Sequence, residues 1–358
     1  MGFASQFQGR TVFVTGADGF IGSHLTEMLA THGADVHAFV RASSSGQLTN
    51  IAHLQDSITV HRGDLTDKRS VMGALECLQA QQDAILFHIA AQAHVGESWE
   101  RPYETINSNV IGTLNLFQSV VDLKLNLFKI VVAGTSEEYG NVQPEMQHHY
   151  RFEQERLVLD EASPINPKSV YAVSKVATVF LAQVYGDAYG IPVAISRMFN
   201  NYGPRQNPRY ITGTVITQAL TGNVIELGYL AAKRDFCYCE DGARGHMAIA
   251  LHGTPGQVYV YGQGQNIAIG DWCSLILAVG EQGGFWNGGR KIVNNPSRGR
   301  LGTTEVEELL VDYAKLHDLT GWAPAFTWEE GLRRTIEWYA DNREKWIGRV
   351  DWFRNAIK

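Results

Sequence analysis

The first 200 residues alternate between short apolar runs and longer stretches in which apolar residues recur at helical spacing. The apolar runs predict strands at 11–15, 35–40, 57–61, 83–90, 128–134 and 192–198. The helical spacing predicts helices at 20–33, 67–80, 104–124 and 170–190. Strands that are apolar throughout and alternate with helices are typical of a parallel sheet covered on both faces. The pattern therefore predicts an α/β fold with a doubly wound parallel sheet.

The pattern becomes less regular after residue 200, where glycines and prolines separate shorter periodic segments. A helix at 211–221, a strand at 224–227 and a final helix at 329–342 are still predicted. We expect residues 1–200 to form a dinucleotide-binding domain to which parts of 234–280 return. Residues 201–358 are expected to form mainly a smaller C-terminal substrate-binding lobe.

Composition and charge narrow the class of protein. The chain has 358 residues, of which 44% are hydrophobic, and a net charge of −7. This acidic balance argues against binding nucleic acid through a broad basic face. No apolar run has the length of a membrane span, and the N-terminal residues lack the apolar core of a signal peptide. We therefore expect a cytoplasmic protein with no nucleic-acid or membrane partner.

The cysteines and the adjacent histidines give no metal-binding pattern. Cys77 and Cys273 stand alone in predicted helices, and Cys237 and Cys239 would share one face of a strand. All four are expected to be inert buried thiols. The pair His148–His149 is expected to lie in a solvated loop. The sequence thus predicts no metal cofactor.

A glycine-rich turn follows the first predicted strand directly and leads into a helix. Glycines at this spacing allow a tight turn, close approach of the backbone to a pyrophosphate and tight helix–strand packing, while the N–H groups at the helix start face the anion. The spacing G-x-x-G-x-x-G is the short-chain dehydrogenase/reductase variant of this Rossmann-type motif. The predicted cofactor contacts of the turn are Gly16, Asp18, Gly19, Phe20, Ile21 and Gly22.

The segment after the second strand bears on the choice of cofactor. A carboxylate for an adenosine ribose would fall near residue 40, where the chain instead has Arg41 and a run of serines that includes Ser43. An arginine with hydroxyl groups suits a 2′-phosphate better than a free diol. NADP is therefore favoured over NAD, although NAD stays possible. Asp64 and Leu65, after the third strand, are candidate adenine contacts.

Two segments carry candidate catalytic groups. Tyr171 and Lys175 are four residues apart in a predicted helix, so the phenol and the ammonium share one face. The adjacent cation and a positive nicotinamide ring would favour the phenolate, which makes Tyr171 a candidate base for a substrate hydroxyl, with Lys175 positioned to hold a cofactor ribose. Thr135, at the end of the fifth strand, can hydrogen-bond the same hydroxyl. Glu137 supplies a second acid or base, whereas Glu138 is expected to be solvated.

Together these residues resemble the extended short-chain dehydrogenase/reductase family, the epimerase/dehydratase group that acts on nucleotide sugars. The resemblance covers nearly the whole chain and is carried by residues 15–22, 90–95, 109–113, 135–140, 171–175, 197–205 and 234–236. It adds Ala90 to the cofactor contacts. The triplet Thr135-Ser136-Glu137 looks like that of the nucleotide-sugar 4,6-dehydratases, such as the GDP-mannose group, in which an Arg/Ser-rich segment accompanies a preference for NADP. Later segments look closer to dehydratases of amino-sugar nucleotides, so the base and sugar stay open.

The same resemblance implies substrate contacts and an assembly. It suggests a nucleoside-diphosphate sugar held by His94, Asn200, Arg205, Arg234 and Arg300. Helices 104–124 and 170–189 match the pair that forms a four-helix dimer interface in the family, so a homodimer is expected. The segment 143–159 is longer than the family pattern suggests. It could cover the substrate, pad a subunit contact or be an inert loop.

The predicted activity is a redox-neutral nucleoside-diphosphate-hexose 4,6-dehydratase, a hydro-lyase that forms a 4-keto-6-deoxy sugar nucleotide. In this interpretation Tyr171 takes the 4-hydroxyl proton, Glu137 removes the C5 proton, and Ser136 or Glu137 assists the departure of water from C6. A 4-epimerase would need only Thr135, Tyr171 and Lys175. The additional acid or base Glu137 therefore argues against an epimerase. A nucleotide-glucuronate decarboxylase is a second alternative, and a non-catalytic cofactor sensor is a third.

Overall fold

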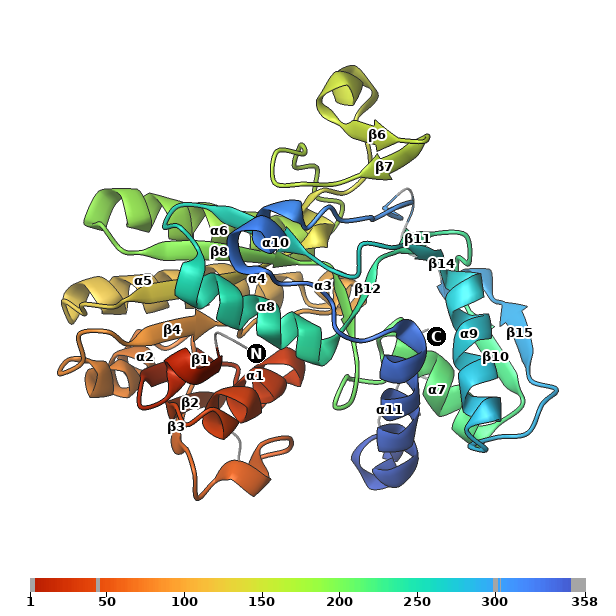
Figure 1. Cartoon of the computed structure of the whole chain (residues 1–358), viewed down its shortest axis with the longest axis horizontal. Helices are drawn as coiled ribbons and strands as arrows, with labels where there is room; N and C mark the ends of the chain where they lie inside the picture. The colour runs from red at the N-terminus through yellow and green to blue at the C-terminus, as the bar shows by residue number, and fades with distance from the viewer. Residues whose placement is uncertain (1–3, 43–45, 299–301, 303, 349–358) are drawn as a thin grey trace.

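A seven-stranded parallel sheet forms the centre of the protein (Figure 1). The computed structural model describes residues 4–42, 46–298, 302 and 304–348. The strand order is β13-β8-β5-β4-β1-β2-β3, which reverses direction between β1 and β4. This arrangement confirms the predicted doubly wound fold. The strands are β1 (Thr11–Thr15), β2 (Asp35–Arg41), β3 (Thr59–Gly63), β4 (Ile85–His88), β5 (Lys129–Thr135), β8 (Val193–Met198) and β13 (Val258–Tyr261).

Helices cover both faces of this sheet, because successive side chains of each strand point to opposite sides. Val12 and Val14 belong to the core on one face, and Phe13 belongs to the core on the other. The first face is covered by α1 (Phe20–Thr31) and α8 (Cys239–His252), and the second by α2 (Lys68–Leu75), α5 (Gly112–Asp122) and α6 (Val170–Tyr189). All residues of β5 are buried, which is why its central residues 130–133 form an uninterrupted apolar run.

The predicted helix 104–124 contains an irregular turn. It begins as α4 (Pro102–Ile106), passes through a π-helical turn, η4 (Asn107–Ile111), and continues as α5. The side chain of Asn109 leaves this turn to hold the loop after β4: its Oδ1 accepts from the backbone N–H of Gln92 (2.7 Å) and its Nδ2 donates to Ser174 Oγ (2.8 Å). Single π-turns of this kind are frequent at functional sites.

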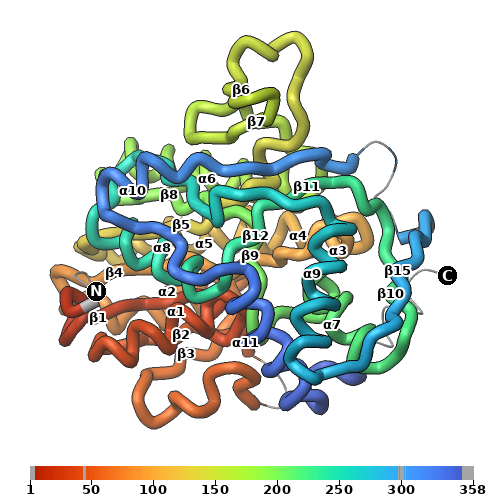
Figure 2. Tube along the Cα trace, turned by 45° about the vertical axis from the view of Figure 1, so that its right-hand side comes forward, coloured from red at the N-terminus to blue at the C-terminus, as the bar shows by residue number. Residues whose placement is uncertain are grey.

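The second half of the chain contributes to both parts of the molecule. α8 and β13 lie within residues 234–280 and join the central sheet domain, as does α10 (Ala314–Thr320), which packs on both. A second lobe surrounds a separate core that includes Trp272. Figure 2 shows the lobe beside the sheet domain. Its elements are α7 (Ile211–Thr221), α9 (Ile269–Gln282), α11 (Trp328–Asp341), β10 (Val224–Leu227) and β15 (Lys291–Asn294).

Short strands and one short helix connect the two parts. β9 (Asn200–Tyr202) pairs with β12 (Phe236–Tyr238), and β11 (Lys233–Arg234) pairs with β14 (Ile267–Ala268). α3 (Val95–Glu100) follows the loop after β4. The β9–β12 pair corrects one prediction: Cys237 lies in β12, but Cys239 begins α8, so the two cysteines do not share a strand face. All four cysteines are free thiols.

The segment 143–159 forms a small unit that stands out from the body of the molecule in both views (Figures 1 and 2). It consists of η6 (Pro144–His149) and a hairpin of β6 (Arg151–Glu153) and β7 (Arg156–Val158). Arg151 donates to Asp312 Oδ2 at 2.6 Å, and Leu157 packs in a cluster with Val311. None of its residues lines the cavity described below. No helix among the described residues has the length and apolarity that crossing a membrane requires.

Candidate active site

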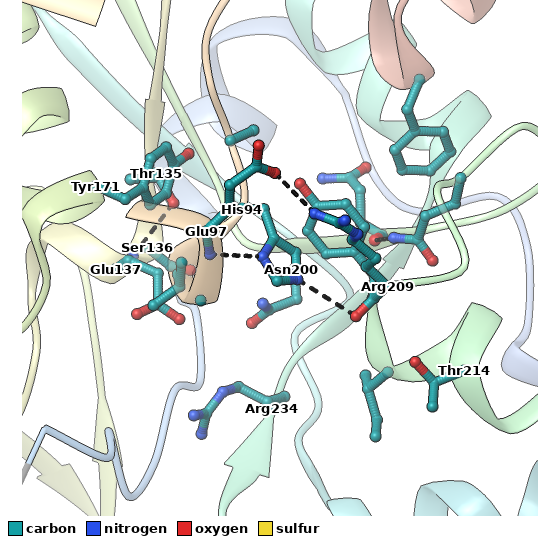
Figure 3. A pocket seen from close by; sticks show the side chains of 18 of the residues that line it. His94, Glu97, Thr135, Ser136, Glu137, Tyr171, Asn200, Arg209, Thr214 and Arg234 are labelled. Atoms are coloured by element: carbon teal, nitrogen blue, oxygen red, sulfur yellow. Dashed lines mark hydrogen bonds and ion pairs between the residues drawn. The ribbon is translucent and has the colours of Figure 1, made fainter. Parts of the chain in front are cut away.

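A cavity of about 700 Å³ lies where the carboxyl ends of the central strands meet the second lobe. One side is lined by the glycine turn after β1, the loop after β4 and the end of β5, and the other by α7 and β10. Figure 3 shows Thr135, Ser136, Glu137 and Tyr171 grouped on one wall. Ligands of doubly wound sheets bind at this edge, at the point where the strand order reverses. The cavity is therefore the candidate active site.

The glycine turn has the close packing that a dinucleotide requires. Gly16 has φ +70°, and a Cβ added there would lie 2.8 Å from Ala90 Cα. A Cβ on Gly22 would lie 2.1 Å from the carbonyl oxygen of Gly16. Both contacts are shorter than side chains allow, so the turn needs glycine to seat α1 against β1. This leaves the first N–H groups of α1 at the cavity, where a pyrophosphate would bind. Among the residues that were predicted to contact the cofactor, the following line the cavity at this turn: Gly16, Gly19, Phe20, Ile21, Gly22 and Ala90.

Five other residues that were predicted to contact the cofactor do not line the cavity: Asp18, Arg41, Asp64, Leu65 and Lys175. The carboxylate of Asp18 accepts from the backbone N–H groups of Thr49 (2.8 Å) and Asn50 (2.6 Å), so it organises the loop after β2. Asp64 accepts from Thr66, and the carbonyl oxygen of Leu65 accepts from Asn115. Ser43 lies outside the described residues.

Arg41 ends β2 with its side chain 75% exposed. Its guanidinium lies 3.8 Å from Asp64 Oδ2 and 4.0 Å from Glu104 Oε1. Such exposed pairs are weak and exchange readily with other partners. The side chain can therefore turn towards a phosphate without breaking a stable ion pair.

The catalytic candidates are brought together at the end of β5. Thr135 is the last residue of β5 and caps the short helix η5 (Ser136–Glu138), with its Oγ1 accepting from the backbone N–H of Glu137 at 3.3 Å. Tyr171 enters from the first turn of α6, which Ser169 caps by accepting from Ala172 N–H. The hydroxyl of Thr135 lies close enough to the phenol of Tyr171 to oppose part of the rise that burial causes in the Tyr171 pKa. Glu137 is 5% exposed and lines the same wall.

Burial shifts the pKa values of Tyr171 and Lys175 in opposite directions, and in each case it favours the uncharged form. Burial raises the pKa of the Tyr171 phenol well above its usual range, and the nearby Tyr210, Glu137 and Glu138 raise it further. Lys175 and a bound nicotinamide ring, which together were predicted to favour the phenolate, would have to offset this effect of burial. Burial also lowers the pKa of Lys175 to about 8, so its ammonium can give up a proton unusually easily.

Glu138 corrects another expectation, because it is completely buried rather than solvated. Its Oε2 accepts from Arg197 Nε at 2.8 Å, and its Oε1 accepts from the backbone N–H of Thr135 at 2.7 Å. Arg197 comes from β8, the strand beside β5, and is itself buried. The pair anchors the end of β5 and so sets the position of Thr135 and Glu137.

Three of the predicted substrate residues line the cavity: His94, Asn200 and Arg234. His94 begins α3, where its Nδ1 accepts from the backbone N–H of Glu97 at 3.0 Å, and burial lowers its pKa, so the ring is neutral. The Oδ1 of Asn200 is buried and has no hydrogen-bond partner in the described structure, which leaves it available to a ligand. Arg234 is 4% exposed and forms a 3.0 Å ion pair with Glu305.

Two predicted substrate residues are not brought to the cavity. Arg205 turns away to pair with Glu27 of α1 at 2.5 Å, and it is not among the cavity-lining residues. Arg300 lies outside the described residues. The cavity instead contains two arginines that the sequence analysis missed. Arg209 pairs with Glu97 (3.2 Å), and Arg298 pairs with Glu226 (3.1 Å). Arg209 lies in a turn and Arg298 ends a three-residue 3-10 helix, segments too short for a periodic signal to distinguish them from surface arginines.

Comparison with known proteins places this geometry in a family. Residues 13–335 match the model of the family described as GDP-mannose 4,6 dehydratase. The dTDP-glucose 4,6-dehydratase of Streptomyces antibioticus is 32% identical, with 94% of this chain and 94% of that protein covered. GDP-mannose 4,6 dehydratase 2 of Caenorhabditis elegans is 28% identical, with 91% and 88% covered.

Solved structures agree with the sequence comparisons. The dTDP-glucose 4,6-dehydratase of Streptomyces venezuelae, determined with NAD and TYD bound, superposes with a TM-score of 0.80. It is 25% identical, with 97% of this chain and 100% of that chain covered. The resemblance inferred from the glycine turn, the Thr-Ser-Glu triplet and the Tyr–Lys pair is thereby confirmed. The chain belongs to the GDP-mannose 4,6-dehydratase family of nucleotide-sugar 4,6-dehydratases.

Proposed function

We propose that the protein removes water from a nucleoside-diphosphate hexose to give the 4-keto-6-deoxy sugar nucleotide. Bound at the glycine turn, a nicotinamide dinucleotide would supply the hydride acceptor for C4 of the sugar and the hydride donor for C6, which would make the overall reaction redox-neutral. The observation that carries the proposal is the burial of Glu137 on the cavity wall beside Thr135 and Tyr171. A carboxylate at this place adds a base that simple oxidation of an alcohol does not need.

Each residue of the wall has a distinct role in this scheme. Tyr171 accepts the proton of the 4-hydroxyl, and Thr135 holds the same oxygen through its hydroxyl. Because burial raises the pKa of Tyr171, the phenol requires positive charge nearby to ionise, and Lys175 on the next helical turn provides part of it. Once C4 is a ketone the C5 proton is acidic, and Glu137 removes it. Ser136, or Glu137 after it has been protonated, then gives a proton to the leaving 6-hydroxyl, and C5 takes up a proton from solvent when hydride returns to C6.

The other end of the cavity suits the diphosphate and base of the substrate. Arg234, Arg209 and Arg298 supply positive charge in an otherwise acidic protein, and charge-assisted contacts are the strong ones for phosphate oxygens. Glu305, Glu97 and Glu226 hold these guanidinium groups in place. The sugar would occupy the space between these arginines and Glu137.

The activity is tested with a panel of GDP-, dTDP- and UDP-sugars, with products separated and weighed by mass spectrometry. Loss of one water from a hexose nucleotide supports the dehydratase. Unchanged mass with inverted stereochemistry at C4 would support a 4-epimerase, which needs only Thr135, Tyr171 and Lys175. Loss of carbon dioxide from a nucleotide-glucuronate would indicate a decarboxylase, and absence of turnover on every sugar would indicate a cofactor sensor.

NADP is the cofactor that we favour, because an exposed arginine and no carboxylate ends β2. The residues present fit a dinucleotide at the glycine turn, and Arg41 would contact its 2′-phosphate. Replacing Arg41 with Gln is expected to weaken NADP binding about ten- to a hundredfold, the cost of a charge-assisted hydrogen bond, while NAD binding stays unchanged. Equal affinity of the native protein for the two cofactors would refute the preference.

We also propose a cytoplasmic homodimer. Support for the dimer is an apolar strip on α6 and the neighbouring turn η4, where Phe180 is 57%, Val184 59% and Ile111 39% exposed. Pairing of this strip with that of a second copy would bury the side chains in a four-helix contact. A Phe180→Asp variant should sediment as a monomer while the native protein sediments as a dimer, and a monomeric native protein at micromolar concentration would refute the proposal. The four free thiols suit a reducing compartment.

A further inference from the structure

Away from the active-site cavity, three potential metal ligands from separate segments meet on the outer part of the sheet. His37 lies in β2, His61 in β3 and Cys77 in the short helix η3 (Glu76–Leu78) that follows α2. One ligand atom from each lies within 4.8 Å of the other two. Figure 1 shows β2, β3 and α2 together, on the opposite side of the molecule from the second lobe. None of the three residues lines the cavity.

The sheet register explains why the two imidazoles meet. His37 is paired with Thr59, and His61 with Phe39, so the histidines are diagonal neighbours on one face of β2 and β3. His37 Nδ1 lies 2.9 Å from His61 Nε2, and the rings stack with centroids 5.2 Å apart. One of these nitrogens donates a hydrogen bond to the other, so the two rings bring one nitrogen each to the same point. Cys77 faces this point from the covering layer, and its Sγ contacts only the carbonyl oxygen of Ala74, at 3.2 Å, among its hydrogen-bond partners in the described structure.

A neighbouring carboxylate completes the arrangement. Asp35 Oδ2 lies 3.5 Å from His37 Nε2, the ring nitrogen that faces away from His61. A metal-bound histidine usually donates its second ring N–H to a carboxylate, which orients the ring and makes the ligating nitrogen more basic. Asp35 itself is held by the hydroxyl of Thr11, at 3.4 Å. The direction in which His37 presents Nδ1 is therefore already fixed in the metal-free protein.

From these observations we propose that His37, His61 and Cys77 bind a zinc ion, with Asp35 as the residue that positions His37. Two imidazoles and a thiolate are the ligands that zinc prefers, and they disfavour the hard cations magnesium and calcium. Tetrahedral zinc with ordinary Zn–N and Zn–S bonds separates its ligand atoms by about 3.3–3.6 Å. The two nitrogens would need to separate slightly and the thiol to approach. Cys77 loses its proton to solvent on binding, and water takes the fourth position.

The zinc ion would link η3 to β2 and β3, the two strands that η3 covers. β3 is the edge strand of the sheet, and most of its residues are only partly buried or exposed. A metal bond between η3 and both β2 and β3 would fasten this edge, which apolar packing holds less firmly than the buried centre. The site is thus structural rather than catalytic, and its loss should leave turnover of the nucleotide sugar unchanged.

The test uses the full chain, stripped with a chelator and titrated with zinc sulfate against a competing chromogenic chelator. We expect one zinc per chain, and cobalt in its place should give a thiolate-to-metal charge-transfer band. Cys77→Ser and His61→Asn should abolish stoichiometric binding and the band. Asp35→Asn should lower zinc affinity about ten- to a hundredfold, the usual effect of removing the carboxylate behind a ligating histidine. Asp35 is half-exposed, so this variant should fold even if the others do not.

A matched control is the double variant His148→Asn/His149→Asn. These imidazoles are also close, with centroids 4.0 Å apart, but they are exposed and no thiol accompanies them among the described residues. Zinc binding should be unchanged in this control. Zinc should also protect Cys77, the least buried of the four thiols, from alkylation by a maleimide. Absence of stoichiometric zinc in the native chain, or full retention of zinc in Cys77→Ser, would overturn the proposal.

Discussion

The conversion of Glu137 to Gln tests the residue that distinguishes a dehydratase from an epimerase. The change keeps the shape of a side chain that is 5% exposed, so the packing at the end of β5 should be preserved. A hydrogen bond to a charged carboxylate contributes about 1.5–3 kcal/mol, and the amide keeps part of it, so the protein should remain folded. What disappears is the basic oxygen that takes the C5 proton.

The expected kinetic effect is much larger than the structural one. Loss of a general base commonly slows a reaction about a hundred- to ten-thousandfold, which corresponds to about 2.7–5.4 kcal/mol in the activation free energy. Oxidation at C4 uses Thr135, Tyr171 and Lys175, none of which is altered. On mixing with substrate, the variant should therefore develop the absorbance of reduced nicotinamide and keep it, whereas the native protein should show it only transiently.

One further variant and one isotope measurement make the result interpretable. Tyr171→Phe removes the group that accepts the 4-hydroxyl proton, so it should develop no such absorbance. Solvent deuterium should enter C5 in the product of the native protein and not in sugar recovered from Glu137→Gln. If Glu137→Gln forms the 4-keto-6-deoxy product at nearly the native rate, Glu137 is not the base, and the epimerase becomes the better interpretation of the cavity.

Three other predictions concern neighbouring groups. Glu138→Gln removes the charged partner of buried Arg197 and should lower the free energy of unfolding by about 3–5 kcal/mol, measured by denaturant titration; a stable variant would refute the anchoring role of the pair. Arg234→Gln should raise the KM for the nucleotide sugar about ten- to a hundredfold with little change in the unfolding midpoint, and an unchanged KM would remove Arg234 from the diphosphate site. Burial lowers the pKa of His24 to about 4 and that of His246 to about 3, so the unfolded chain takes up protons below pH 6.5 that the folded chain does not. The contribution of these two histidines to the free energy of unfolding should be complete above pH 6.5 and should be lost as pH drops towards 4. The free energy should fall less steeply with pH in His246→Leu. An identical pH profile for the native protein and the variant would contradict this assignment.

Local patterns in the sequence were enough to predict the sheet domain and part of the site. Each strand of the sheet that was predicted before residue 200 is present. A central strand such as β5 was predictable because burial on both faces requires apolar residues along it. The glycine turn was predictable because its three glycines and the strand and helix that flank them lie next to one another in the sequence. Tyr171 and Lys175 were predictable as a pair because one helical turn places them on the same face.

Contacts between distant segments could be decided only by the tertiary structure. Glu137 and Glu138 are adjacent and chemically identical, yet one lines the cavity and the other is buried against Arg197 of the neighbouring strand. Nothing in the local sequence distinguishes them, because the difference arises from the pairing of β5 with β8. The edge strand β13 joins the sheet from residue 258 for the same reason.

The arginines illustrate this limit most clearly. The choice between a cavity and an ion pair depends on the path of the surrounding loop, and loops carry no periodic signal. Arg205 was predicted to bind substrate but pairs with Glu27, while Arg209, four residues later, lies in the cavity. Short-range periodicity reports which face of an element avoids water, and so it predicts helices and strands. The partner of a charged side chain is selected by the packing of elements that are far apart in the chain, and that selection appears only once the fold is assembled.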